Sequence, residues 1–276
     1  MLPSFVIGLR EGLEAALIVG IIAAFLVTRG KGLRPIWLGV ALAIGLCASL
    51  AVTFAVVGSK LSFKAQETME GVLALVAVAG VTYMIVWMRR HAREMKGDLE
   101  SRAALAITAG SGLALAFMAF FAVLREGLET AIFLLAAFQQ AAEPLAAGLG
   151  AVMGVLLAVG LGYGIYRGGV RIDLARFFKL TGLVLVFVAA GLLASAVHSL
   201  AEAGLVTVWQ STAFDLSWLV APGSVRESLL TGMFGLRPSP TVAEVLVWLA
   251  YAIPMAIYVW APARRPATER HAVPAA

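Results

Sequence analysis

The chain has 276 residues, of which 61% are hydrophobic and only 13% are charged. Soluble domains carry roughly 25% charged residues, so this composition excludes an ordinary soluble domain and indicates a protein that crosses a membrane several times. The formal net charge of +5 could suggest a nucleic-acid partner. However, the basic residues lie in short connections between apolar runs, as the topology of a membrane protein requires, and we expect no nucleic-acid binding.

The apolar runs are continuous rather than alternating, which favours membrane-spanning helices over the strands of a barrel. We therefore predict an all-α, polytopic membrane protein with seven transmembrane helices. Residues 1–261 would form a single transmembrane domain in contact with the lipid bilayer, and residues 262–276 would form a disordered cytoplasmic tail. The predicted spans are residues 5–27, 36–57, 71–88, 113–138, 149–166, 180–200 and 242–260.

Lysine and arginine concentrate in the connections that follow the first, third and fifth spans, and in the tail. Because cytoplasmic loops of membrane proteins are enriched in these residues, the distribution places the N-terminus outside the cell and the C-terminus inside. An odd number of spans follows, in agreement with seven. The same orientation makes residues 205–241 an extracytoplasmic segment between the sixth and seventh spans.

Two further features limit the alternatives. The single cysteine, Cys47, excludes a disulfide framework and a thiolate metal cluster. The N-terminus has no basic region before its apolar run, and Arg10 lies inside that run. We therefore interpret residues 5–27 as a retained first span, not as a cleaved signal peptide.

The pentapeptide REGLE occurs twice, at residues 10–14 in the first span and at residues 125–129 in the fourth. A charge at the centre of a bilayer costs about 2.5–3.5 kcal/mol on the translocon scale, so these side chains must face one another, water or a ligand. Within each helix, the arginine and the second glutamate are four residues apart and share one face. The glycine of each copy removes side-chain bulk, from which we predict a close approach of the two helices.

The duplication extends beyond the pentapeptide, because residues 70–75 resemble residues 181–186. We predict repeat one at about residues 1–91 and repeat two at about residues 104–204, with the seventh span appended. Since each repeat has three spans, the two copies would have opposite orientations, as in the inverted repeats of secondary transporters. These transporters hold their substrate at the repeat interface near the membrane midplane, where the two pentapeptides would meet.

Four glutamates and two arginines give the paired pentapeptides a net formal charge of −2. A buried site with this charge requires a proton or a cation. Carboxylates without cysteine or histidine form a hard oxygen site, suited to iron, manganese, magnesium or calcium. An alternative is that each arginine neutralises a glutamate and only locks two helices together, which leaves two negative charges unexplained. The predicted metal ligands are Glu11, Glu14, Glu126 and Glu129, supported by Arg10 and Arg125.

A second polar group is expected on the outer side. His198 and Glu202 are four residues apart at the end of the sixth span, and Glu67 and Glu70 begin the third span, its equivalent in the other repeat. These residues could form an outer relay that passes a cation to the site. The alternative is that His198 is a capped or solvated residue at a helix end.

Three other residues receive structural interpretations. Glu244 begins the seventh span, where an acidic side chain favours a helix N-terminus. Met84 and Met88 lie at lipid or packing positions, where methionine is an ordinary core filler, and we assign them no metal role.

Two Arg-Glu-x-x-Glu strings, in the first and fourth spans of a seven-span protein, resemble the oxidase-dependent high-affinity iron permease family, which includes bacterial EfeU-type and fungal ferric permeases. One copy would be weak evidence, whereas two copies at corresponding repeat positions are specific. The resemblance covers nearly the whole chain, including YMIVWMRRHAR at residues 83–93, GLLASAVHSLAEAG at residues 191–204 and PTVAEVL at residues 240–246.

The resemblance implies a transporter, not an enzyme, that takes up iron across the cytoplasmic (inner) membrane. It assigns iron translocation to the six charged residues of the two pentapeptides. Iron would be the substrate, with no permanently bound cofactor. Family members work beside an oxidase or peroxidase or a periplasmic iron-binding protein, and this sequence has no such domain, so we expect separate partner subunits.

Both Fe²⁺ and Fe³⁺ fit these ligands. Because oxygen ligands discriminate poorly, transport of another divalent ion, such as lead or manganese, is an alternative. A non-transporting structural membrane subunit is a second alternative, and it predicts that the glutamates tolerate glutamine. A haem-binding subunit would need paired axial ligands within the spans, and an intramembrane metalloprotease would need a His-Glu-x-x-His string, which is absent.

Overall fold

The computed structural model describes residues 1–28, 30, 32–58, 60–91, 112–139, 141, 143–167, 173–215, 235 and 237–261. Their regular structure is helical apart from one isolated β-bridge between Thr212 and Thr241. Each predicted span coincides with one helix, which confirms the all-α class. The helices are α1 (Leu2–Thr28), α2 (Arg34–Gly58), α3 (Phe63–His91), α5 (Gly112–Gln139), α6 (Pro144–Tyr166), α7 (Leu174–Glu202) and α9 (Val242–Trp260).

Five of these helices, α2, α3, α6, α7 and α9, are long and apolar enough to cross a membrane. Helices α1 and α5 are as long, with 27 and 28 residues, but each is interrupted by one arginine and two glutamates. The number of apolar helices identifies a multi-pass membrane protein. The two pentapeptide helices differ from these five because charged residues interrupt their apolar sequence.

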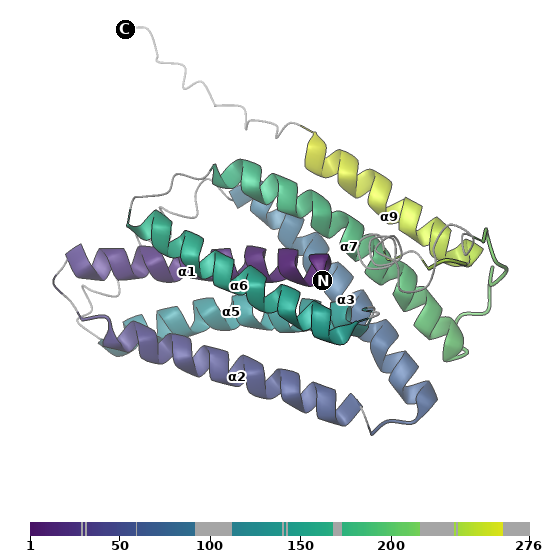
Figure 1. Cartoon of the computed structure of the whole chain (residues 1–276), viewed down its shortest axis with the longest axis horizontal. Helices are drawn as coiled ribbons and strands as arrows, with labels where there is room; N and C mark the ends of the chain where they lie inside the picture. Colours follow the sequence, from purple (N-terminus) through teal and green to yellow (C-terminus); the bar gives the residue numbers. More distant parts are fainter. Residues whose placement is uncertain are drawn as a thin grey trace, which may run out of the picture.

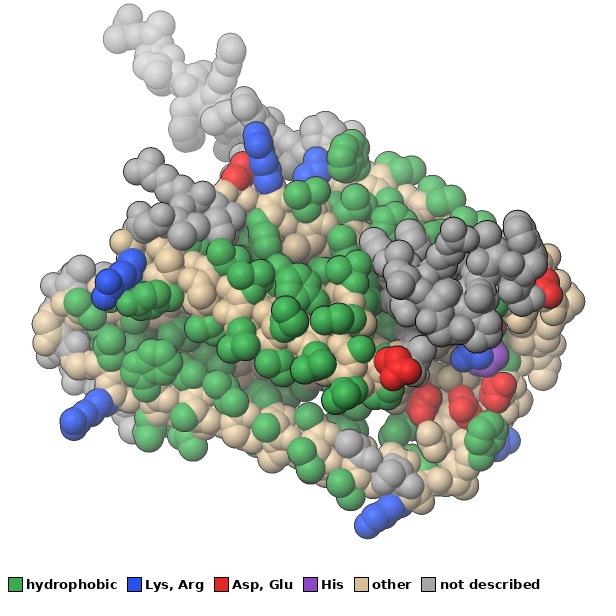
Figure 2. All heavy atoms as spheres, viewed as in Figure 1, with side chains coloured by type: hydrophobic (Ala, Val, Ile, Leu, Met, Phe, Trp, Pro, Cys, Tyr) green, Lys and Arg blue, Asp and Glu red, His purple; other side chains and the backbone are tan. Residues whose placement is uncertain are grey.

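The surface of the bundle is strongly apolar. Hydrophobic side chains cover the middle of the face shown in Figure 2. On α2, large residues such as Trp37, Leu42 and Phe54 are exposed. A soluble protein rarely exposes so continuous an apolar surface, whereas a bilayer provides the solvent that such a surface requires.

The two pentapeptide helices have similar packing partners in the bundle. Helix α1 packs most extensively on α6, and α5 packs most extensively on α2, while α3 packs on α7 (Figure 1). The lesser contacts of α1 with α7 and of α3 with α5 match each other as well. Exchanging α1, α2 and α3 with α5, α6 and α7 therefore leaves this set of helix pairs unchanged.

Small residues bring α1 and α6 together. A Cβ atom added at Gly162 of α6 would lie 2.6 Å from Ala16 Cβ, and one added at Gly154 would lie 2.7 Å from the backbone nitrogen of Leu9. The backbones of the two helices are thus in direct contact, as at the small-residue interfaces of membrane helices. This contact fixes the part of α1 that carries the first pentapeptide.

We expect Gly154→Val to destabilise the protein by about 1–3 kcal/mol, because overpacking a close helix contact forces backbone shifts. Gly160→Val on the same helix is the matched control, since a Cβ there meets no atom within 4 Å. Thermal unfolding in detergent, followed by tryptophan fluorescence, measures the difference. Equal losses for both variants would contradict the interface described above.

The predicted tail at residues 262–276 and most of the centre of the segment 205–241 lie outside the described residues. The two described ends of that segment are joined at the start of α9. The amide of Ala213 donates to the carbonyl oxygen of Pro240 at 2.9 Å, and the amide of Val242 donates to Ser211 at 2.9 Å. These bonds join the start of α9 to residues 211–213, which follow the end of α7 in the chain.

Candidate metal centre

The first pentapeptide forms a fully buried ion-pair network. Arg10 is only 1% exposed. Its Nη1 donates to Glu11 Oε1 at 2.9 Å, and its Nη2 lies 3.0 Å from Glu14 Oε1. The prediction that Arg10 and Glu14 share a helix face is therefore confirmed. One guanidinium bridges two carboxylates, a geometry that suits its planar fork of donors.

Arg10 also contacts other helices that the sequence did not connect with it. Its Nη1 faces the sulfur of Met84, and its Nη2 lies 2.9 Å from the sulfur of Met88, both on α3. On α7, the ring of Phe178 lies 5.8 Å from the guanidinium carbon. The two methionines do pack in the core, as predicted, but they also enclose the buried cation.

The second pentapeptide is more open. Arg125 Nε donates to Glu129 Oε1 at 3.0 Å and lies 3.6 Å from Glu126 Oε1. The Arg125 side chain is nevertheless 46% exposed, and it stacks over the ring of Trp87 at 5.1 Å. Two identical strings thus have different environments, one closed and one accessible.

Carboxylates from the two pentapeptides converge. One oxygen each from Glu11, Glu126 and Glu129 lie within 4.8 Å of one another, a spacing that could hold one metal ion. The Oε2 atom of each of these residues is buried and has no hydrogen-bond partner in the described part of the chain. Glu14 is not part of this group and faces Arg10 instead. The structure therefore distinguishes three clustered carboxylates from Glu14, whose Oε1 forms an ion pair with Arg10 but no hydrogen bond among the described residues.

Such a cluster is unfavourable without a counter-ion. Two unit charges 4.8 Å apart repel by roughly 3 kcal/mol even at an effective dielectric constant of about 20. A buried oxygen without a donor adds a desolvation cost of about 1–3 kcal/mol. A bound cation or a proton would relieve both costs. The arrangement is thus a candidate site for a hard cation between α1 and α5.

The role predicted for the glycines was wrong in one respect. A Cβ at Gly12 would lie 2.9 Å from Ala158 Cβ on α6, and one at Gly127 would lie 2.6 Å from Cys47 Sγ on α2. The glycines therefore face the supporting helices rather than each other. Gly12 lets α6 approach α1, and Gly127 lets α2 approach α5. The carboxylates lie on the other side of these helices and face the α1–α5 contact.

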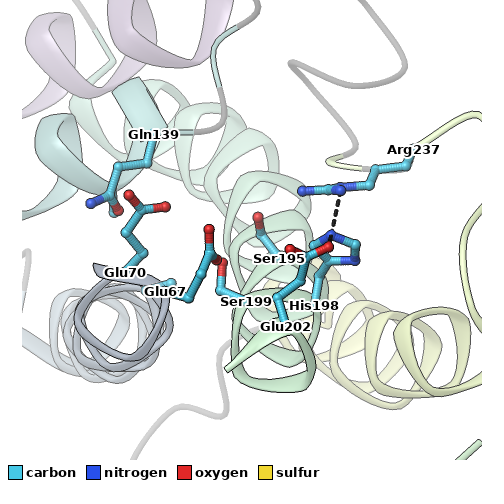
Figure 3. A pocket seen from close by; sticks show the side chains of 10 residues that line it. Glu67, Glu70, Gln139, Ser195, His198, Ser199, Glu202 and Arg237 are labelled. Atoms are coloured by element: carbon cyan, nitrogen blue, oxygen red, sulfur yellow. Dashed lines mark hydrogen bonds and ion pairs between the residues drawn. The ribbon is translucent and has the colours of Figure 1, made fainter. Parts of the chain in front are cut away.

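The four residues of the predicted outer relay line one cavity of about 180 Å³. Figure 3 shows Glu67 and Glu70 on α3 opposite His198 and Glu202 on α7. His198 is neither free nor simply solvated, because its Nδ1 lies 3.0 Å from Glu244 Oε1 and its Nε2 lies 3.4 Å from Glu202 Oε1.

The sequence did not connect Glu244 with this cavity. Glu244 is 3% exposed and contacts His198 of the cavity wall, so it does more than begin α9. The histidine and this glutamate are 46 residues apart, and no local pattern connects them. The further lining residues are Ala74, Ala136, Gln139, Ser195, Ser199 and Arg237.

These features define a class of protein: a multi-pass helical membrane protein with a buried carboxylate cluster between two equivalent helices. The comparisons with known proteins agree with this class. Residues 1–266 match the iron permease FTR1 family, and the chain belongs to that family.

Curated relatives resemble the chain over its full length. It is 44% identical over 277 residues to the ferrous iron permease EfeU of Escherichia coli O6:K15:H31, which covers 99% of this chain and 100% of the relative. The protein of the same name from Yersinia pestis is 44% identical over 268 residues, covering 96% and 95% respectively. No solved structure matches the chain.

Proposed function

We propose that this protein is an iron permease of the cytoplasmic membrane that moves iron through the carboxylate cluster between α1 and α5. The observation that carries the proposal is the convergence of Glu11, Glu126 and Glu129, each with a buried, unpartnered oxygen. Family membership supports iron as the substrate. The resulting donor set is all oxygen, which suits iron.

The proposed topology has seven spans, with the N-terminus outside and the C-terminus in the cytoplasm. Basic residues at the end of α3 and the start of α7 support a cytoplasmic location for the C-terminal end of α9, because Arg89 and Lys179 both contact residues there. Acidic residues gather at the opposite end, over the start of α3 and the end of α7 (Figure 2). In this topology α1 and α5 also span the membrane, with their charges turned inward.

The helix pairs support an inverted repeat. Each pentapeptide helix packs on the second helix of the other repeat, and the pair α3–α7 maps onto itself. A pseudo-two-fold axis in the membrane plane would produce this pattern and would place the carboxylate cluster on the axis. This is the position at which inverted-repeat transporters bind their substrates.

We propose Fe²⁺ as the transported ion. The relatives named above are ferrous iron permeases. A net formal charge of −2 for the six charged residues of the two pentapeptides also matches a divalent ion, whereas Fe³⁺ would leave a buried positive charge. Release would be assisted by Arg125, which is already hydrogen-bonded to Glu129 and exposed enough to move closer to the cluster. The separate oxidase, peroxidase or iron-binding subunits stay a prediction.

Uptake of radioactive iron into proteoliposomes tests the proposal. We expect uptake by the purified chain with ascorbate, which keeps iron ferrous, and much less without it. Competition by Mn²⁺ and Pb²⁺ measures selectivity. Uptake favoured without a reductant would indicate Fe³⁺, and absence of uptake under both conditions would support a structural subunit instead.

A further inference from the structure

The outer cavity lies at one end of the bundle and shares helix α5 with the carboxylate cluster. It is lined by the start of α3, the end of α5 and the end of α7. Its α5 residues, Ala136 and Gln139, follow Glu129 by two to three helical turns, or about 10–15 Å at 1.5 Å per residue. The cavity is therefore distinct from the cluster but close to it along one helix.

Several side-chain oxygens that line this cavity make few or no hydrogen bonds. Ser199 is only 7% exposed, and its hydroxyl has no hydrogen-bond partner among the described residues. The carboxylate of Glu67 also has none there, and Glu70 accepts one bond, from Gln66 at 3.0 Å. In Figure 3, Ser199 lies between these α3 carboxylates and Glu202. The hydroxyl of Ser199 thus adds one more oxygen to a cavity wall that already carries carboxylates.

Glu244 orients the imidazole ring of His198 in this cavity. Glu244 is buried and lies 3.0 Å from Nδ1 of His198, so Nδ1 can donate to it and leave the lone pair of Nε2 facing the cavity. Carboxylates orient metal-binding histidines in this way.

The position in front of Nε2 is taken by a cation of the protein itself. Arg237 Nη1 lies 2.5 Å from His198 Nε2 (Figure 3). Arg237 is exposed, and the neighbouring Gly235 packs against Gly191 of α7, which places this part of the chain over the cavity. An exposed arginine next to a histidine nitrogen and three carboxylates occupies the place that a metal ion would take.

We propose that this cavity is a capture site for a divalent cation, with Glu67, Glu70 and Glu202 as oxygen ligands and His198 as a nitrogen ligand. Ser199 completes the lining, and the guanidinium of Arg237 occupies the site until an ion displaces it. Three carboxylates and one arginine give a net formal charge of −2, as in the inner cluster. That the captured ion passes on to the inner cluster rests on the proposed function, whereas binding itself does not.

Equilibrium binding of Fe²⁺ to the full chain in nanodiscs, without oxygen, tests this site. The measurement uses a Glu126→Gln background, in which the inner cluster is disabled and only the outer site is expected to bind. Adding Glu67→Gln and Glu202→Gln should weaken the remaining binding by about tenfold or more, as for the loss of metal ligands or their partners. Glu143→Gln is the control, because Glu143 is exposed near the same end, makes no side-chain cap bond and does not line the cavity.

Arg237→Gln gives a result of the opposite sign. Removing the competing cation should strengthen Fe²⁺ binding severalfold, an effect that misfolding cannot produce. In transport, the glutamine variants on the unmodified background should raise the iron concentration for half-maximal uptake and keep the maximal rate. Unchanged binding in both the glutamate and arginine variants would overturn the capture site. Fe²⁺ binding at the outer site without binding at the inner cluster would contradict the proposed function alone. Binding at the inner cluster without binding at the outer site would contradict the capture site alone.

Discussion

Glu126→Gln is expected to reduce Fe²⁺ binding at the inner cluster by about a hundredfold or more and to abolish uptake. The change is isosteric but removes one of three carboxylates that lie within 4.8 Å of one another. Loss of a residue that only orients a metal ligand costs about 10–100-fold in affinity, so a direct ligand should lie at or beyond the upper end of this range. Initial rates of iron uptake into proteoliposomes, at several iron concentrations, provide the measurement.

Two further variants make this test specific. Glu14→Gln should have a smaller effect on iron binding, because Glu14 is paired with Arg10 and lies outside the group of three. Glu143→Gln should have none, since Glu143 is an exposed residue before α6. Normal uptake by the Glu126 variant would contradict the proposed cluster and favour a structural subunit.

Arg10→Met should destabilise the folded protein far more than Arg125→Met, although both change the same position of the same pentapeptide. Arg10 is buried, and its removal leaves Glu11 and Glu14 buried without a cation, which costs about 3–5 kcal/mol. The Arg125 side chain is 46% exposed, where an ion pair contributes about 0–1 kcal/mol. Thermal unfolding of the two variants without iron, in the same detergent, gives the comparison.

Arg10→Lys distinguishes charge from geometry. A single ammonium keeps the charge but cannot span Glu11 and Glu14 as the planar guanidinium does. We therefore expect Arg10→Lys to recover only part of the stability lost in Arg10→Met. Equal stability of Arg10→Met and Arg125→Met would show that the difference in burial has no energetic consequence.

The sequence predicted the helices for clear physical reasons, whereas of the four predicted metal ligands only Glu11, Glu126 and Glu129 cluster. Long apolar runs leave the backbone no alternative to a helix in lipid, so each predicted span corresponds to a helix in the described part of the chain. A spacing of four residues placed Arg10 and Glu14 on one face, as the structure confirms. The iron permease family was also predicted correctly, because two pentapeptides at repeat-related positions are specific.

The differences between the two copies could not be predicted. Identical pentapeptides differ in exposure because Arg10 is enclosed by Met84 and Met88, whereas Arg125 stacks on Trp87. These contacts come from another helix, and local spacing contains no information about them. The pairing of His198 with Glu244 depends in the same way on how α9 packs against α7.

The way the charged helices are supported has a consequence for how the two halves depend on each other. Helix α1 rests on α6 and α5 rests on α2, so each half of the chain supplies the scaffold for the charged helix of the other half. The halves are interlocked, and neither contains the surface that its own charged helix needs. If the protein arose by duplication, a half-length ancestor would have needed a second copy of itself to supply the surface on which its charged helix packs.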